Sequence, residues 1–170
     1  MSPGSGGPFD RLRRRLRHFD GLGDVRDFLA VGVALLRVPF DLSRLGLSRL
    51  LVRLDAPRRA RGVPPVGDAA LARGRRLALY ADVWLRYQRP PNPCLRRSLV
   101  LFGRLRRMGV PVTFCLGIRT EEPLGADGPV LGHAWLELGG QTILESEGGA
   151  AMRATTFRYP LDPPPQARFA

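Results

Sequence analysis

The hydrophobic pattern of this 170-residue chain changes its period at Gly109. Before that glycine, apolar residues recur three and four positions apart, which is the spacing of a buried helix face. After it, apolar and polar residues alternate, which is typical of half-buried strands. A helical half followed by a strand half predicts an α+β fold of one domain, in which helices pack on a small antiparallel sheet.

The N-terminal part of the chain predicts a basic arm and a helical hairpin. Residues 1–20 are rich in Gly, Pro and Arg and are expected to form a flexible basic arm. Residues 24–38 have helical spacing, with Asp24 at the start and Pro39 expected to close the helix. A second helix is expected from Asp41, and the Pro- and Arg-rich segment after it predicts a linker, so that hairpin and linker occupy 21–66.

The rest of the chain, residues 67–159, is expected to form the core. A helix from Asp68 to about Gln88 ends at the run RPPNP, and the next helix begins at Cys94, with its apolar side chains inward and its five arginines largely outward. Strands are expected at PVTFCLGI, GHAWLEL and QTILE, the last two joined by a tight Gly139-Gly140 turn. An irregular tail is expected over 160–170.

Charge is distributed unevenly along the chain. The net charge is +12, and every one of the 27 basic residues is arginine. Residues 1–110 carry 23 arginines and 8 acidic residues, whereas residues 111–170 carry 4 arginines and 7 acidic residues. Arginine pairs with phosphate and carboxylate alike, so nucleic acid, an acidic membrane surface and an acidic protein are all raised as partners. No aromatic interleaving or docking motif supports nucleic acid, and we expect none to bind.

Several classes of protein are not indicated by the sequence. Two cysteines are too few for a disulfide framework, and as free thiols they fit a cytoplasmic location. The start of the chain lacks the apolar region of a signal peptide. The longest uncharged apolar run, Phe28 to Leu36, is far shorter than the about 20 residues of a spanning helix, which leaves only peripheral membrane contact open.

Three residues suggest nucleophilic catalysis. Cys94 follows Asn92-Pro93 at the head of a helix, where unpaired N–H groups and the helix dipole favour a thiolate. His133 begins the GHAWLEL strand, and Glu145 ends the strand expected to pair with it. A tight turn between two strands brings the start of one beside the end of the other, so Glu145 is expected to orient the imidazole that serves Cys94 as a base.

This ordered pattern resembles the transglutaminase-like, papain-related cysteine peptidase superfamily. The likeness rests on CLRRSL at the helix start, on LGIR at the end of the first strand and on HAW. Within the superfamily it is similar to the B2 proteins of lasso peptide biosynthesis, over most of residues 22–148. The resemblance implies catalytic roles for Cys94 as nucleophile, His133 as base and Glu145 as third member, although that family commonly has Asp at the last position.

The resemblance also implies a function and partners. The reaction would be removal of the leader peptide from a ribosomally made lasso precursor, assisted by a separate leader-binding protein (a PqqD-like recognition element) and followed by a lasso cyclase. An enzymatic alternative is a transglutaminase-like acyl-transferase. An alternative of another class is a non-catalytic basic scaffold that binds nucleic acid or membrane.

Several other residues are candidates for the site, and each has an ordinary structural role as an alternative. Glu137 and Glu147 are fallback third members, although Glu137 is expected to be a surface or substrate-contacting residue. Cys115 is expected to be a buried, inert thiol. Gln88, six positions before Cys94, is an oxyanion donor or a helix-end surface residue. A zinc site would need both cysteines and both histidines, His18 included, without any short ligand spacing, so neither a metal nor a cofactor is expected.

Overall fold

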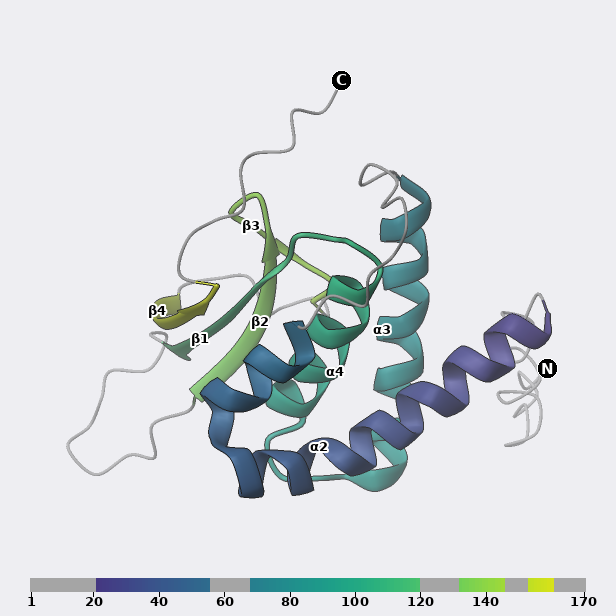
Figure 1. Cartoon of the computed structure of the whole chain (residues 1–170), viewed down its shortest axis with the longest axis horizontal. Coiled ribbons are helices and arrows are strands. Elements are labelled where there is room, and N and C mark those ends of the chain that lie inside the picture. The colour runs from purple at the N-terminus through teal and green to yellow at the C-terminus, as the bar shows by residue number, and fades with distance from the viewer. Residues whose placement is uncertain (1–20, 56–67, 120–131, 146–152, 161–170) are drawn as a thin grey trace, which may run out of the picture.

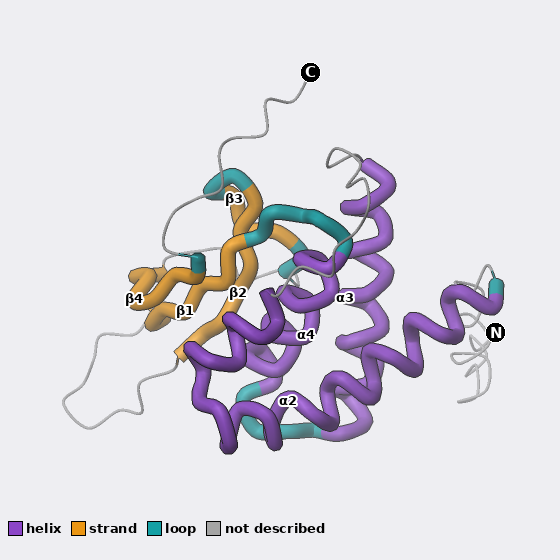
Figure 2. Tube along the Cα trace, in the orientation of Figure 1, coloured by secondary structure: helices purple, strands orange, loops and turns teal. Residues whose placement is uncertain are grey.

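The fold of this chain is α+β, as the change of period predicts. The computed structural model describes residues 21–55, 68–119, 132–145 and 153–160. Within these ranges, three helices pack beside a four-stranded antiparallel sheet with the strand order β3-β2-β1-β4. Figure 2 shows the helices gathered on one side and the strands on the other. The predicted arm over 1–20, the linker after Asp55 and the tail after Pro160 lie outside the described residues.

Helix α2 (Leu22–Asp55) has two helical parts, as predicted, but the predicted boundary between them at Pro39 is wrong. The helix runs through Pro39, and its backbone becomes non-helical at Gly46, where φ is 71° and ψ is 167°. A positive φ is easily adopted only by glycine, so the bend lies where the side chain is absent. Figure 1 shows that α2 bends, and its second part lies against α4, where Asp55 pairs with Arg106.

Helices α3 (Asp68–Gln88) and α4 (Pro93–Arg107) agree with the predicted helices to within a residue or two. α4 packs against α2, α3 and strands β1 and β2, which makes it the central helix (Figure 1). The expectation that its arginines point largely outward is wrong, because of the five only Arg107 is exposed. Arg97 forms an ion pair with Asp82 of α3, and Arg106 forms one with Asp55 of α2.

The sheet contains the three predicted strands and one that the sequence did not indicate. β1 (Thr113–Arg119) pairs with β2 (Gly132–Leu138), which pairs with β3 (Gln141–Ile143) through the predicted Gly139-Gly140 turn. Both glycines have positive φ, as a two-residue hairpin turn requires. β4 (Arg153–Tyr159) pairs with the other edge of β1 and was missed. Because β2 pairs with β1 on one side and with β3 on the other, it is an internal strand of the sheet.

One hydrophobic core joins the helices to the sheet. Phe102 of α4 packs edge-on against Phe114 of β1, with ring centroids 6.2 Å apart, and against Tyr159 of β4 at 5.9 Å. Val31 and Leu35 of α2 belong to the same buried cluster. Because α4 is fixed on three sides by this core, the residues at its N-terminus have a defined position over the sheet.

Candidate active site

Cys94 lies in the first turn of α4, immediately after Pro93. Asn92 precedes the helix in a left-handed conformation (φ 52°, ψ 57°), and Pro93 occupies the first helical position, where its missing N–H leaves no bond unmade. The Cys94 side chain is half-buried. The local sequence thus places a thiol among the unpaired N–H groups of a helix N-terminus.

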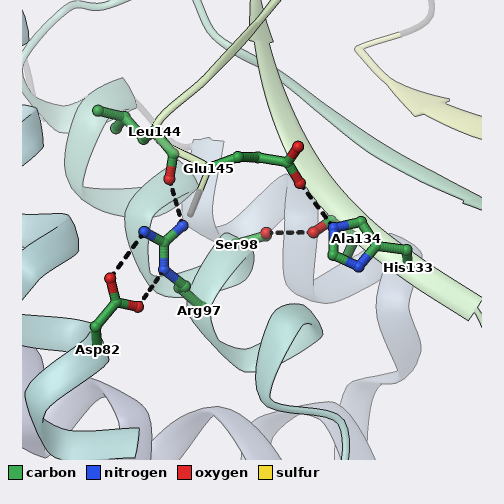
Figure 3. A network of polar contacts seen from close by, with 7 residues as sticks. All are labelled: Asp82, Arg97, Ser98, His133, Ala134, Leu144 and Glu145. Carbon is green, nitrogen blue, oxygen red and sulfur yellow. Dashed lines mark hydrogen bonds and ion pairs between the residues drawn. The ribbon is translucent and has the colours of Figure 1, made fainter. Parts of the chain in front are cut away.

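His133 and Glu145 are in direct contact. Nε2 of His133 lies 2.7 Å from Oε1 of Glu145, and the side chains are 28% and 14% exposed (Figure 3). Because Glu145 engages Nε2, the other ring nitrogen is the one left to face the thiol. A carboxylate in this position orients the ring and stabilises its protonated form.

This contact depends on an irregularity at Leu144. The register pairs Leu136 with Ile143, so a regular extension of β3 would place Glu145 opposite Ala134 and on the face of the sheet that His133 does not share. The strand ends at Ile143, and Leu144 has a φ of 57°. This left-handed residue breaks the alternation and allows the carboxylate to reach the imidazole.

The environment of Cys94 favours its thiolate. Burial of the sulfur raises the pKa of Cys94, but a hydrogen bond with the His133 side chain and the charge of that ring lower it. Hydrogen bonds from the backbone N–H groups of Ala134 and Leu95 act in the same direction. The net result is a Cys94 pKa below the usual value of 9.0, as its helix-terminal position predicts, although the contacts responsible come mainly from β2.

Two side chains of α4 hold the neighbours of His133 and Glu145, and the sequence interpretation assigned neither a role. Oγ of Ser98, which is buried, donates a 2.9 Å hydrogen bond to the carbonyl of Ala134. Arg97 Nη1 donates to the carbonyl of Leu144 at 2.5 Å, and its Nε lies 2.6 Å from Asp82 Oδ1 (Figure 3). The available signal was their place one turn after Cys94, in the segment CLRRS.

A cavity of about 440 Å³ opens over these residues. Cys94, His133 and Glu145 line it together with Trp135, Arg86 and Leu101, so the lining combines apolar and polar side chains. Such a volume accommodates a few residues of an extended peptide or one large side chain. The arrangement can form an acyl-thioester on Cys94, with His133 as the proton donor and acceptor.

The structure separates other candidates from this site. Glu137 is 6% exposed, which corrects the expectation of a surface residue, and it accepts hydrogen bonds from Trp135 Nε1 at 3.0 Å and from Arg158. Cys115 is fully buried, as expected, and burial together with Glu137 raises its pKa to about 12. Gln88 ends α3 and does not line the cavity. The fallback residue Glu147 lies outside the described residues.

Across the described ranges, no three His, Cys, Asp or Glu side chains come together as metal ligands would. None of the helices in those ranges combines the length and the hydrophobicity of a transmembrane span.

Comparison with known proteins gives one match. A family model described as the transglutaminase-like superfamily covers residues 34–158, a range that includes Cys94, His133 and Glu145. No curated protein and no solved structure matches the chain significantly. The family match spans well over half of the sequence and includes the helix and the strands that form the cavity. The chain therefore belongs to the transglutaminase-like superfamily.

Proposed function

We propose that this protein is a cytoplasmic cysteine peptidase that removes the leader peptide from a ribosomally synthesised lasso precursor peptide. The superfamily includes cysteine peptidases and acyl-transferases. The observation that carries the proposal is the chain of contacts from Cys94 to His133 to Glu145 in the wall of one cavity. The likeness of CLRRSL, LGIR and HAW to the lasso B2 proteins supplies the substrate class.

In the proposed reaction, the Cys94 thiolate attacks the carbonyl carbon of the scissile peptide bond. His133 gives its proton to the leaving amine, and the carbon–nitrogen bond breaks to leave a thioester on Cys94. Neutral His133 then takes a proton from water, whose oxygen attacks the thioester and releases the leader as a free acid. Cys94 leaves as a thiolate, and the protonated imidazole is restored.

Glu145 and backbone donors complete the proposed mechanism. The Glu145 carboxylate stabilises the imidazolium and holds the ring toward the thiol. The Cys94 backbone N–H lies in the first turn of α4, where no helical carbonyl precedes it, and it is the proposed donor to the oxyanion. The thioester explains how one fold serves hydrolysis when water resolves it and acyl transfer when an amine does.

The proposed partners follow from the lasso pathway. A separate leader-binding protein, the PqqD-like recognition element, would present the precursor, and a lasso cyclase would use the released core peptide. The cavity by itself is large enough to hold only the residues around the scissile bond, which is consistent with recognition of the leader by another protein.

The test is a cleavage assay with purified protein, precursor and leader-binding partner, read by mass spectrometry. We expect separate leader and core peptides with the native chain and with Cys115→Ala, whose thiol lies away from the cavity, and a loss of about 10⁴-fold or more with Cys94→Ala. Cleavage by Cys94→Ala at the native rate would refute the nucleophile. A cross-linked product in place of a hydrolysed one would identify an acyl-transferase instead.

A further inference from the structure

Helix α4 carries Cys94 and also contacts the residues next to His133 and Glu145. Ser98 bonds the carbonyl of Ala134, which follows His133, and Arg97 bonds the carbonyl of Leu144, which precedes Glu145. Figure 3 shows both contacts, which reach from one turn of the helix to Ala134 in β2 and to Leu144, the residue after β3. One rigid element thus contacts the backbone next to each partner of the thiol.

Arg97 is itself held by a second contact. Its Nε and Nη2 lie 2.6 Å and 3.2 Å from the two carboxylate oxygens of Asp82 on α3, and its side chain is 15% exposed. A bidentate pair fixes the plane of the guanidinium, so the remaining Nη1 has one direction in which to donate. That direction is the Leu144 carbonyl, 2.5 Å away.

We propose that Arg97, fixed by Asp82, is a positioning residue that sets Glu145 against His133 through the Leu144 carbonyl. Leu144 adopts a left-handed backbone that leucine rarely adopts, and such a conformation persists only where neighbouring contacts enforce it. Without it, the alternation of the strand would turn the Glu145 carboxylate away from His133. The expected effect of Arg97 on leader removal rests on the proposed function, whereas its effect on the position of Glu145 does not.

The test uses the reactivity of the Cys94 thiol, which requires no substrate. The pH dependence of alkylation by iodoacetamide is measured for Arg97→Ala, Arg97→Lys and Glu145→Gln. We expect Arg97→Ala to move the inflection to higher pH, in the same direction as Glu145→Gln, because each weakens the support of the His133 imidazolium. A lysine ammonium cannot bind both Asp82 oxygens and the Leu144 carbonyl at the same time. The inflection of Arg97→Lys is therefore expected at a pH between those of the native protein and Arg97→Ala.

A matched control exists on the same helix. Arg106→Ala breaks the ion pair with Asp55, which is also half-buried but lies at the far end of α4 from Cys94. We expect Arg106→Ala to lower the melting temperature while leaving the alkylation profile unchanged. If both arginine variants shift the profile equally, Arg97 has only a general structural role and the proposal is wrong.

The double variant Arg97→Ala/Glu145→Gln decides whether Arg97 acts through Glu145. We expect it to match Glu145→Gln alone, in the alkylation profile and in kcat/KM for leader removal, because residues that act through one contact are not additive. Fully additive effects would show that Arg97 acts independently of Glu145, and an effect of Arg97→Ala confined to KM would indicate a contact with substrate; either result would overturn the proposal. Absence of leader cleavage in all forms, with the expected alkylation shifts, would refute the proposed function and leave this inference standing.

A second inference comes independently from the outer face of α2. Six apolar side chains on this helix are between 44% and 90% exposed, and we call them the α2 stripe: Leu22, Val25, Leu29, Val33, Leu36 and Phe40. Their spacing of three and four residues averages the helical repeat, so they lie along one straight line. Figure 1 shows this part of α2 extending away from the sheet.

The exposed charged side chains beside the α2 stripe are arginines. Arg26, Arg37 and Arg44 are exposed next to it, and Arg44 lies 4.5 Å over the Phe40 ring. The carboxylates of the same segment are largely buried and paired: Asp27 lies 2.7 Å from Arg73 of α3, Asp24 lies 3.8 Å from Arg76 of α3, and Asp41 lies 3.7 Å from Arg53 of α2. An apolar line with arginines beside it and, among the described residues of this segment, no exposed carboxylate matches the interface of an anionic bilayer.

We propose that the α2 stripe lies on the surface of anionic membranes. Sedimentation with vesicles tests it, comparing phosphatidylglycerol mixed with phosphatidylcholine against phosphatidylcholine alone. We expect binding to the anionic vesicles only, weakened about tenfold or more by Leu29→Gln/Leu36→Gln. The control Val52→Gln/Leu79→Gln removes as many exposed apolar side chains outside the stripe and is expected to bind normally.

Three outcomes would overturn the membrane proposal. The first is no binding to anionic vesicles. The second is binding that the Leu29→Gln/Leu36→Gln variant retains in full, which would assign it to the arginines elsewhere in the chain. The third is a dimer in solution that this variant dissociates, which would show that a second copy covers the stripe.

Discussion

Nε2 of His133 lies 2.7 Å from Oε1 of Glu145 although the ladder between β2 and β3 does not place the two residues opposite each other. The left-handed residue Leu144 turns the chain after β3 so that the carboxylate reaches the ring. The contact between His133 and Glu145 therefore depends on the backbone conformation at the end of β3 and on the contacts that hold this backbone in place.

Glu145 is expected to matter through its charge. Glu145→Gln keeps an oxygen that can accept from His133 but removes the carboxylate that stabilises the imidazolium. We expect kcat/KM for leader removal to fall about 10²- to 10⁴-fold with the fold unchanged by circular dichroism. Glu145→Asp retains the charge on a shorter side chain, so its kcat/KM should fall less than that of Glu145→Gln. Native activity in Glu145→Gln would exclude the carboxylate from the mechanism.

The two cysteines are expected to differ in reactivity. The pKa of Cys94 is below its usual value, whereas burial raises that of Cys115 to about 12. At neutral pH, iodoacetamide should label Cys94 in the folded protein and leave Cys115 unmodified, as peptide mapping would show. Both should react in guanidinium chloride. Preferential labelling of Cys115 in the folded protein would contradict the site.

Removal of His133 should change the pH dependence of that labelling. The His133 hydrogen bond and charge lower the pKa of Cys94, so the thiolate is retained to lower pH than in a free cysteine. Without the ring, burial is opposed by the backbone donors alone, and the inflection in His133→Ala should move to higher pH. An inflection that stays in place would mean that the two side chains do not interact.

Ser98 should contribute to stability as well as to placement. Its hydroxyl is buried and donates to the Ala134 carbonyl, so Ser98→Ala leaves a buried acceptor unpaired at a cost of about 1–3 kcal/mol in unfolding free energy. Ser43 makes a similar bond to the Phe40 carbonyl on the exposed surface. Ser43→Ala should change the free energy by less than about 0.5 kcal/mol. Urea denaturation measures the unfolding free energy of both variants, and equal losses of unfolding free energy in Ser98→Ala and Ser43→Ala would contradict the role of burial.

Two glycines of α2 should respond oppositely to alanine. A Cβ at Gly32 would lie 2.5 Å from Trp84, whose ring stacks on Phe28 and donates to its carbonyl. Gly32→Ala should therefore destabilise the protein by about 1–3 kcal/mol. Gly23 has no atom within 4 Å of its would-be Cβ, and Gly23→Ala should stabilise by up to about 1 kcal/mol. Thermal denaturation that ranks them the other way would contradict this packing.

Much of the fold was accessible from the sequence because local signals and packing agree. The period of the apolar residues, the run RPPNP and the Gly139-Gly140 turn located α3, α4 and the β2–β3 hairpin. The boundary predicted inside α2 is wrong because proline usually ends a helix, whereas this helix tolerates the lost N–H of Pro39 and breaks at Gly46, where a positive φ is needed. β4 is not predictable in this way because its pairing partner, β1, is distant in sequence and no hairpin-turn motif joins the two strands.

The candidate site was predictable in its residue types but not in its supports. Cys94 was recognised from its place at a helix start, and its neighbours His133 and Glu145 from the hairpin. The pairing argument, however, assumed a regular strand, and the register shows that Leu144 must break it. The roles of Arg97 and Ser98 depend on contacts between elements far apart in the chain, which periodicity does not report.

In the proposed reaction, Cys94 forms a thioester with the leader during its removal. The most direct measurement is acid quenching during turnover of the native protein with precursor and leader-binding partner, followed by peptide mapping by mass spectrometry. We expect the leader segment to be attached through its C-terminal carbonyl to the peptide that contains Cys94, with no adduct on Cys115. Continued leader removal by Cys94→Ala, with no adduct at Cys94 in the native protein, would contradict the proposed reaction.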